Sequence, residues 1–248
     1  MNLVVDIGNS YIKWAYSRDA VLSGFGRKQY DRNRIIELLD NNWSALEKPD
    51  QVLVANVAGN TMARELAKWT SSHWQINPDF IQVSKEVHGV RNAYADFQTL
   101  GIDRWLSLIA AWQKFQCACL IVDCGTAVTI DVIDHSGQHQ GGLIFPGEIT
   151  MQRSLHQSTD ALPDADVTAT ATNLAKSTRD GISHGCLLAV LAAIEYAAQN
   201  SGLQTNDNIK YIITGGDASR IMQLLRQDFI HEPHLVLEGL ALIKGQLS

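Results

Sequence analysis

Apolar segments and amphipathic segments alternate along most of the chain. Short apolar segments rich in β-branched residues predict buried strands, and they lie at 3–7, 51–57, 80–83, 120–122, 128–132, 143–147 and 211–214. Longer segments with apolar residues at helical spacing predict helices, and they lie at 32–46, 62–69, 105–112, 181–199, 219–226 and 238–247. Strands that alternate with helices of this length predict an α/β fold, in which helices pack on a mixed sheet.

One pattern occurs twice in the chain. Residues 3–13 and residues 120–131 each contain an apolar run, an Asp-x-Gly turn, a small polar residue and a run of alternating character. Each copy predicts a β-hairpin. Because the two Asp-x-Gly turns are 117 residues apart, we predict two related halves, 1–116 and 117–248, that close on one ligand.

The turn of the second copy carries groups suited to a phosphate. Gly125 lets the backbone turn sharply and lets a phosphate approach the amides, Thr126 offers a hydroxyl, and Asp123 offers a carboxylate for a cation. Taken alone, Asp, Gly and Thr are ordinary turn formers. The repetition of the pattern is what favours phosphate binding.

The longest predicted helix, 181–199, is apolar on more than one side. We expect it to be central to its domain and also part of a subunit interface. The preceding stretch 159–178 is rich in small and polar residues, which predicts a loop or lid.

Composition narrows the class of function. The chain of 248 residues has a formal net charge of −6, which argues against nucleic acid or an anionic membrane as a partner. The N-terminus has neither a basic start nor an apolar signal core, and no uncharged run is long enough to span a bilayer. We therefore expect a cytoplasmic protein that acts on small molecules. The four cysteines lack C-x-x-C spacing, which predicts buried thiols rather than disulfides.

A second candidate site is the segment Gly101-Ile102-Asp103-Arg104, which precedes a predicted helix. Asp103 could cap that helix, with Arg104 a solvated neighbour. Alternatively, the carboxylate could accept the proton of an alcohol, and the guanidinium could pair with a substrate carboxylate. Beside two phosphate hairpins the second interpretation is favoured.

Five motifs occur in a distinctive order: Asp6-x-Gly8-Asn9-x-x-x-Lys13, Gly101-x-Asp103-Arg104, Asp123-x-Gly125-Thr126-Ala127-x-Thr129, Gly141-Gly142-x-Ile144-x-Pro146-Gly147 and Gly215-Gly216-Asp217. This ordered set spans almost the whole chain and resembles the type III pantothenate kinases of the actin-like sugar kinase superfamily. The resemblance implies two actin-like (ribonuclease H-like) domains, each a mixed sheet flanked by helices, with the ATP site between them. It also implies ATP-dependent phosphorylation of pantothenate to 4′-phosphopantothenate, the first committed step toward coenzyme A.

The resemblance also implies roles for individual residues. The first hairpin would meet the ATP phosphates through Asp6, Ile7, Gly8, Asn9, Ser10, Tyr11, Ile12 and Lys13. Asp6 would hold Mg²⁺, directly or through water, and Thr126 would contact phosphate from the second hairpin. Asp123 would help to hold the monovalent cation, K⁺ or NH₄⁺, and Gly215-Gly216-Asp217 would form a floor beneath the adenosine.

For pantothenate, the resemblance implies that Asp103 is the base on the hydroxyl group. The binding residues would be Tyr94, Gly101, Ile102, Asp103, Arg104 and Thr178. The family forms this site at the interface of a homodimer. This sequence departs from the family in having Ser10 where threonine is usual and Ser177 where asparagine is common, and both departures keep a polar side chain.

Two other functions are compatible with the sequence. A phosphatase or acetate-type kinase of the same fold would need another carboxylate to place its nucleophile, and Glu148 is the candidate beside the hairpins. A non-catalytic nucleotide-binding regulator is the other alternative, although such a protein should have lost some of the acidic residues named above. No G-x-G-x-x-G follows a predicted strand, which argues against a dinucleotide oxidoreductase.

His231 and His234 are separated by Pro233, and we expect them in a surface loop rather than in a metal site.

Overall fold

The computed structural model describes residues 1–159, 168–202 and 209–243. It divides into two compact units, of which one comprises Met1–Lys114 with His234–Ser248 and the other comprises Phe115–Pro233. The division after Lys114 lies close to the boundary expected after residue 116. The C-terminal segment differs from the expectation, because it belongs to the first unit and not to the second.

The first unit is built on a five-stranded mixed sheet of order β3-β2-β1-β4-β5. Its strands are β1 (Asn2–Ile7), β2 (Tyr11–Arg18), β3 (Val21–Gln29), β4 (Val52–Asn56) and β5 (Asp79–Phe80). β1, β2 and β3 run antiparallel to one another in that order, whereas β4 is parallel to β1 and β5 is parallel to β4. The repeated sequence pattern therefore does form a hairpin here, between β1 and β2.

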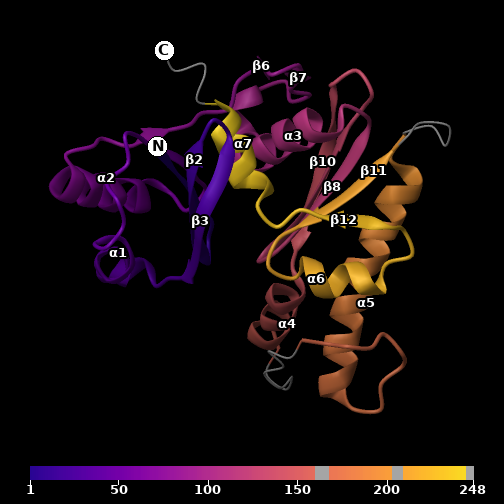
Figure 1. Cartoon of the computed structure of the whole chain (residues 1–248). Coiled ribbons are helices and arrows are strands. Elements are labelled where there is room, and N and C mark those ends of the chain that lie inside the picture. Colours follow the sequence, from indigo (N-terminus) through magenta and orange to yellow (C-terminus); the bar gives the residue numbers. More distant parts are fainter. Residues whose placement is uncertain (160–167, 203–208, 244–248) are drawn as a thin grey trace. The chain divides into compact units, whose positions relative to one another are not determined.

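Helices cover both faces of this sheet (Figure 1). On one face, α1 (Ile35–Trp43) and α2 (Asn60–Trp74) pack through a tryptophan cluster against alternate residues of β1. Trp43 lies at its centre, with ring centroids 5.7 Å from those of Trp14, Trp69 and Trp74. These rings exclude water from a core that begins at the base of the first hairpin.

The other face of the sheet carries α7 (Leu235–Ile243), which packs against β1, β2, β3 and β4. Gly239 allows α7 to approach α3 (Ile102–Phe115), since a Cβ at this position would lie 2.3 Å from the carbonyl oxygen of Leu106. This close contact explains why the C-terminal helix belongs to the first unit: its apolar pattern predicts a buried helix but does not show which sheet it covers. The unit also holds the short elements β6 (Glu86–Val87), β7 (Val90–Arg91), η1 (Arg32–Arg34) and η2 (Phe97–Thr99).

The second unit repeats the arrangement of the first, with a five-stranded sheet of order β10-β9-β8-β11-β12. Its strands are β8 (Cys119–Cys124), β9 (Ala127–Ile133), β10 (His139–Pro146), β11 (Lys210–Thr214) and β12 (Phe229–His231). Again the first three are antiparallel, and the last two are parallel to their neighbours. Two units with matching strand order and direction confirm the predicted fold class, a pair of mixed sheets flanked by helices.

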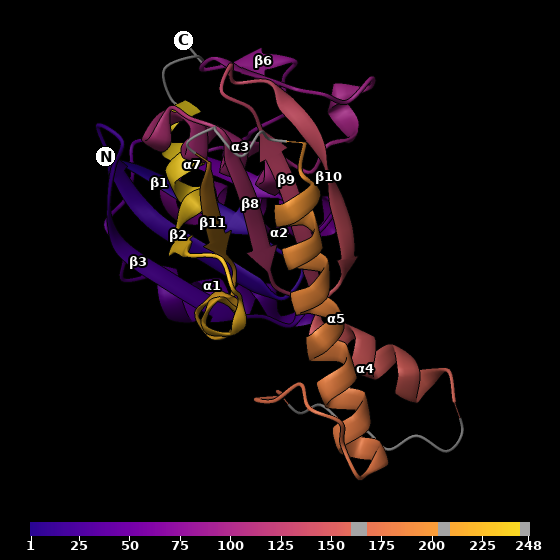
Figure 2. The same cartoon turned by 90° about the vertical axis from the view of Figure 1, so that its right-hand side faces the viewer.

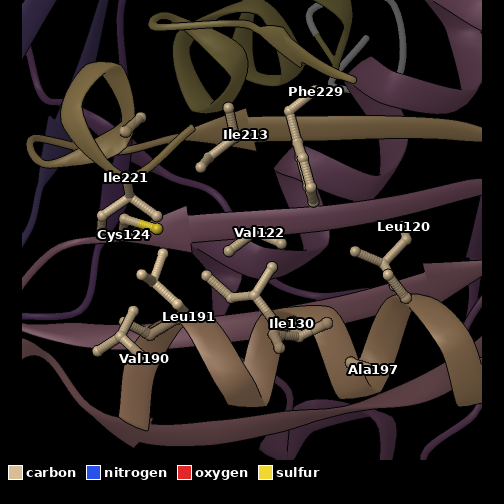
Figure 3. Packing of buried hydrophobic residues seen from close by; sticks show 14 of the residues in the cluster. Leu120, Val122, Cys124, Ile130, Val190, Leu191, Ala197, Ile213, Ile221 and Phe229 are labelled. Atoms are coloured by element: carbon tan, nitrogen blue, oxygen red, sulfur yellow. The ribbon is translucent and has the colours of Figure 1, made fainter. Parts of the chain in front are cut away.

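The core of this unit lies between the sheet and α5 (Thr178–Asn200), and Figure 3 shows its packing. Leu120 and Val122 of β8 and Ile130 of β9 belong to one buried cluster with side chains of α5, among them Val190, Leu191 and Ala197. The short helix α6 (Ala218–Ile221) adds Ile221 to the same cluster, and η3 (Met222–Leu224) follows it. By length and composition α5 is the one helix among the described residues that could cross a membrane, but it packs here as a core helix.

The helix α4 (Glu148–Gln157) was not predicted from the sequence. It follows β10 directly and lies beside α5 (Figure 2). It covers the end of the sheet where the second hairpin turns. Of the expected loop at 159–178, residues 168–177 have no helix or strand and 160–167 lie outside the described residues.

Candidate active site

The first hairpin turns between Ile7 and Tyr11, and the amide of Gly8 donates to the carbonyl of Tyr11 over 3.0 Å. Ile7 and Ile12 are fully buried in the core, so only their backbone groups are available to a ligand. Asn9 is exposed, whereas Gly8, Ser10 and Tyr11 are half-buried. The turn therefore presents backbone amides and two small polar side chains.

Charges of both signs lie at the base of this turn. Asp6 and Lys13 face each other across the two strands, with the ammonium Nζ of Lys13 3.7 Å from a carboxylate oxygen of Asp6. Asp6 is only 6% exposed, so its charge is little screened by solvent. A cation and an anion at this spacing can hold a phosphate and its metal together.

Two residues that the sequence interpretation missed support the same turn. The hydroxyl of Tyr30 donates to the carbonyl of Gly8 over 2.5 Å, and the guanidinium of Arg32 donates to Asn9 Oδ1 over 3.0 Å. Burial raises the pKa of the Tyr30 hydroxyl, and this effect outweighs the lowering effect of Arg32. The hydroxyl is therefore protonated at neutral pH and can donate. No local pattern marks these residues, because they reach the turn only through the pairing of β3 with β2.

The segment Gly101-Ile102-Asp103-Arg104 begins α3, as the sequence predicts. A carboxylate oxygen of Asp103 accepts the backbone amide of Arg104 at 2.8 Å, and a Cβ on Gly101 would lie 2.6 Å from that same oxygen. Glycine therefore leaves the space that the Asp103 carboxylate occupies.

Arg104 is buried and lies next to Tyr94, which comes from the irregular segment before η2. The guanidinium donates to the Tyr94 hydroxyl over 3.0 Å and lies 5.7 Å from the centre of its ring. The structure thus brings together Tyr94, Gly101, Asp103 and Arg104, four of the predicted substrate residues. The side chain of the fifth, Ile102, is buried.

The turn of the second hairpin is held by the residues that follow β10. The carbonyl oxygen of Thr126 accepts the amide of Gly147 at 2.9 Å and the hydroxyl of Thr150 at 2.6 Å. A Cβ on Gly147 would lie 2.1 Å from the carbonyl oxygen of Gly125, so only glycine fits there. Thr126 is exposed at this turn, and the Pro146-Gly147 motif is its support.

On its other side the second hairpin contacts the Gly215-Gly216-Asp217 loop. β11 pairs with β8 so that Thr214 lies opposite Asp123. Gly215 has a φ of +99°, and a Cβ there would lie 2.5 Å from a carboxylate oxygen of Asp123 and 2.3 Å from the carbonyl oxygen of Cys124. The amide of Asp217 donates to that same carbonyl over 3.0 Å. Three of the five motifs therefore meet in the second unit.

The thiol of Cys124 lies at the end of β8, close to several charged side chains. Burial raises the pKa of its thiol strongly, and the carboxylates of Asp123 and Asp217 raise it further, whereas Arg220 lowers it. The thiol therefore stays protonated and packs as a small apolar side chain. Cys119 and Cys186 are also buried, Cys117 is half-buried, and all four are free thiols, as predicted.

Glu148, the candidate carboxylate for a phosphatase, is fully engaged elsewhere. It is 3% exposed, and its oxygens accept the amide of Ala169 at 2.9 Å, the side-chain amide of Gln152 at 3.3 Å and the guanidinium of Arg220 at 2.5 Å. A carboxylate satisfied by these three donors is poorly placed to activate a water molecule. This geometry removes the observation on which the phosphatase alternative depended.

Thr178 is the first residue of α5 and is exposed. Ser177 caps the helix by accepting the amide of Asp180 at 3.1 Å, which shows that serine serves well at this position. Thr178 also borders a largely apolar cavity of about 710 Å³ between α4 and α5, lined further by Pro146, Met151, Ile182 and Cys186. That volume is typical of a small-molecule site.

The two histidines considered for a metal do not share a loop. His231 is the last residue of β12, and His234 stacks on Phe25 with ring centroids 4.0 Å apart. Among the described residues no group of three or more His, Cys, Asp or Glu side chains could hold a metal ion.

Two similar units, each with a mixed sheet and an Asp-x-Gly hairpin at its start, define an α/β protein of the actin-like fold. Solved structures support this fold. One described as that of a Baf family transcriptional activator from Campylobacter jejuni covers 98% of both chains with a TM-score of 0.61 and 24% identity. One described as that of a 2-dehydro-3-deoxygalactonokinase from Sinorhizobium meliloti covers 100% of both chains with a TM-score of 0.54 and 12% identity.

Sequence comparison gives the family. Residues 2–200 match the model of the type III pantothenate kinases. The type III pantothenate kinase of Nitrosococcus oceani is 39% identical over 253 residues, covering 100% of this chain and 95% of the relative. The chain belongs to the type III pantothenate kinase family. It is a kinase, and the family supports a role in pantothenate phosphorylation for coenzyme A biosynthesis, with ATP and a divalent metal.

Proposed function

We propose that this chain transfers the γ-phosphoryl group of ATP to the primary hydroxyl of pantothenate, with Asp103 as the base. The observation that carries the proposal is the paired placement of Asp103 and Arg104 at the N-terminus of α3, with Arg104 held by Tyr94. The carboxylate of Asp103 can accept the proton of the pantothenate hydroxyl, and the guanidinium of Arg104 can pair with the pantothenate carboxylate.

In this proposal the pantothenate oxygen forms a bond to the γ-phosphorus while the bond from that phosphorus to the oxygen shared with the β-phosphate breaks. The hydroxyl proton passes to Asp103, and ADP leaves. Because phosphoryl transfer depends mostly on positioning and charge neutralisation, Asp103 acts chiefly by aligning the nucleophile. Arg104 forms a forked pair with the pantothenate carboxylate, which a lysine would match less well. Tyr94, Gly101, Ile102 and Thr178 complete this site.

The first hairpin binds the ATP phosphates in this proposal. The backbone of residues 7–12, the hydroxyl of Ser10 and the ammonium of Lys13 face the phosphates, because the side chains of Ile7 and Ile12 are buried. Asp6 fits Mg²⁺, since its carboxylate supplies hard oxygen ligands at the base of the turn. Bound Mg²⁺ supplies neutralisation of phosphate charge. Tyr30 and Arg32 hold the turn in place.

The second hairpin binds phosphate through Thr126 and a monovalent cation, K⁺ or NH₄⁺, through Asp123. Support comes from the close packing of Gly215, whose ideal Cβ position lies within 2.5 Å of both a carboxylate oxygen of Asp123 and the carbonyl oxygen of Cys124. Gly215-Gly216-Asp217 then forms the floor beneath the adenosine. The two domains of the proposal are those expected from the sequence, with the C-terminal helix reassigned to the first.

The working form in this proposal is a cytoplasmic homodimer, and neither nucleic acid nor membrane takes part. The outer face of α5 supports dimerisation, because Leu188 is 50% exposed and Tyr196 is 67% exposed on the side of the helix that faces away from the core. Gly181 and Gly185 extend the same face toward the cavity beside Thr178. The net charge of −6 agrees with a proposal in which neither nucleic acid nor an anionic membrane takes part.

The test is pantothenate-dependent release of ADP from MgATP in sodium buffer, with and without added K⁺ or NH₄⁺. We expect release that requires pantothenate and rises strongly when either cation is added. ADP release that does not depend on pantothenate would point to another acceptor. Nucleotide binding with no ADP release under any condition would favour a non-catalytic nucleotide-binding regulator. Equal rates with and without the cations would remove the cation site at Asp123.

A further inference from the structure

Glu148, which is buried, and Arg220, which is partly exposed, form an ion pair that joins two motifs far apart in sequence. Glu148 directly follows Gly147, and Arg220 lies on α6, three residues after Asp217. Glu148 is 3% exposed and the side chain of Arg220 is 24% exposed. Desolvating such a pair is costly, so its presence calls for an explanation beyond stability.

The pair closes a ring of contacts around the second hairpin. The hairpin turn is bonded to Gly147 through Thr126, Gly147 is covalently followed by Glu148, and Glu148 bonds Arg220. Arg220 in turn donates its backbone amide to the carbonyl of Asp217 over 3.2 Å, and the amide of Asp217 returns to the hairpin at Cys124. The support on one side of the hairpin is thereby tied to the loop on its other side.

The same pair also fixes a third segment. Glu148 accepts the amide of Ala169 at 2.9 Å, and Arg220 donates to the carbonyl of Ala169 over 2.9 Å. Both backbone groups of this buried residue are thus held by the pair, nine residues before Thr178 begins α5. Glu148 and Arg220 are therefore the common partners of three segments that border the site.

We propose that Glu148 and Arg220 are positioning residues for nucleotide binding, which set the distance between the hairpin turn at Thr126 and the loop at Gly215-Gly216-Asp217. This inference rests on the proposed function for the identity of the nucleotide. Neither residue touches the reacting atoms. If the pair is broken, the hairpin turn and the loop lose their fixed spacing, and groups that should contact the phosphates and the adenosine no longer do so together.

The experiment measures the Kd of MgATP by calorimetry, together with the KM of ATP and of pantothenate, on the full chain. For Glu148→Gln we expect the Kd and KM of ATP to rise about tenfold or more, with a smaller change in the KM of pantothenate. Arg220→Lys keeps the charge but loses the forked geometry, and it should give an intermediate effect. The matched control is Glu195→Gln, which breaks the more exposed pair of Glu195 with Arg226 in the same unit and should leave both constants unchanged.

A structural role and a positioning role are separated by the double variant Glu148→Met with Arg220→Met. An apolar pair of similar volume often restores stability, but it cannot restore the bonds to Ala169. We expect a thermal unfolding midpoint near that of the wild type with ATP affinity still weakened. Wild-type affinity in a stable double variant, or in a folded Glu148→Gln, would overturn the proposal. Because ATP binding is measured without pantothenate, a wrong acceptor assignment would appear only in the turnover assay.

Discussion

Asp103 makes a structural hydrogen bond and also carries the proposed role of base, and the two can be separated. Its Oδ1 accepts the amide of Arg104 in the first turn of α3. Asparagine keeps an acceptor oxygen of the same reach but cannot take a proton, so we expect Asp103→Asn to fold normally. Its kcat should fall by about 10²- to 10⁴-fold, the range of a lost general base.

The measurement is ADP release under saturating substrates, with circular dichroism and thermal unfolding as checks on the fold. Asp96→Asn is a matched control, because Asp96 also accepts a backbone amide at the start of a helical turn in the same unit. It should retain wild-type turnover. A folded Asp103→Asn with near-normal kcat would take the base role away from Asp103.

For single residues, the sequence predicts a structural role where the hydrogen-bond partners lie close by in the chain. Asp-x-Gly turns and the helix start at Gly101 can be recognised because their partners lie within a few residues. Tyr30 and Arg220 reach their partners over 22 and 72 residues, so only the folded chain shows them. The substrate roles themselves came from the resemblance and stay predictions.

At the scale of elements, the Gly215 loop is held by a steric fit that one methyl group would break. Gly215→Ala would combine a φ of +99° with a Cβ that overlaps Cys124 and Asp123. We expect a loss of stability of about 1–3 kcal/mol and a weaker affinity for ATP, because the loop and the hairpin must separate.

The matched control for this prediction is Gly141→Ala. Gly141 has a φ of +103°, but nothing lies within 4 Å of its ideal Cβ position. This variant carries the backbone strain without the overlap, so its thermal unfolding midpoint should fall less and its ATP affinity should stay unchanged. Equal effects of the two substitutions would show that backbone strain alone matters.

The elements that the sequence predicted are those that bury apolar side chains in a regular pattern. Strands β1, β4, β8 and β11 and the long helix α5 belong to this group. β3 was missed because it is an edge strand with most residues exposed, and its form depends on pairing with β2. α4 was missed because it buries only Glu148 and Gln152, which are polar residues. The helix expected at 219–226 is reduced to α6 and η3.

At the scale of the whole molecule, α5 has one face in the core and another that is apolar and exposed. The exposed face carries Leu188 and Tyr196 together with small residues that permit close helix packing, among them Gly185, Ala189 and Ala192. A patch of this kind on a chain with a net charge of −6 favours association with a second copy, which would bury it. Thr178, at the start of the same helix, would then lie close to the partner.

We therefore expect Leu188→Asp to convert a dimer into a monomer, since a carboxylate buried in an apolar interface loses its hydration without gaining a partner. The side chain lies outside the core, so the fold of each copy should persist. If the pantothenate site needs the second copy, the monomer should bind ATP but show a strongly raised KM for pantothenate. Sedimentation velocity gives the oligomeric state, and titration with each substrate separates the two sites.

The control variant is Val21→Asp, which also replaces an exposed apolar residue, one that is 70% exposed. It should leave both the oligomeric state and the substrate titrations unchanged. A monomeric Leu188→Asp with full activity would show that one copy contains the complete site, and a wild-type chain that is already monomeric at assay concentration would contradict the dimer itself.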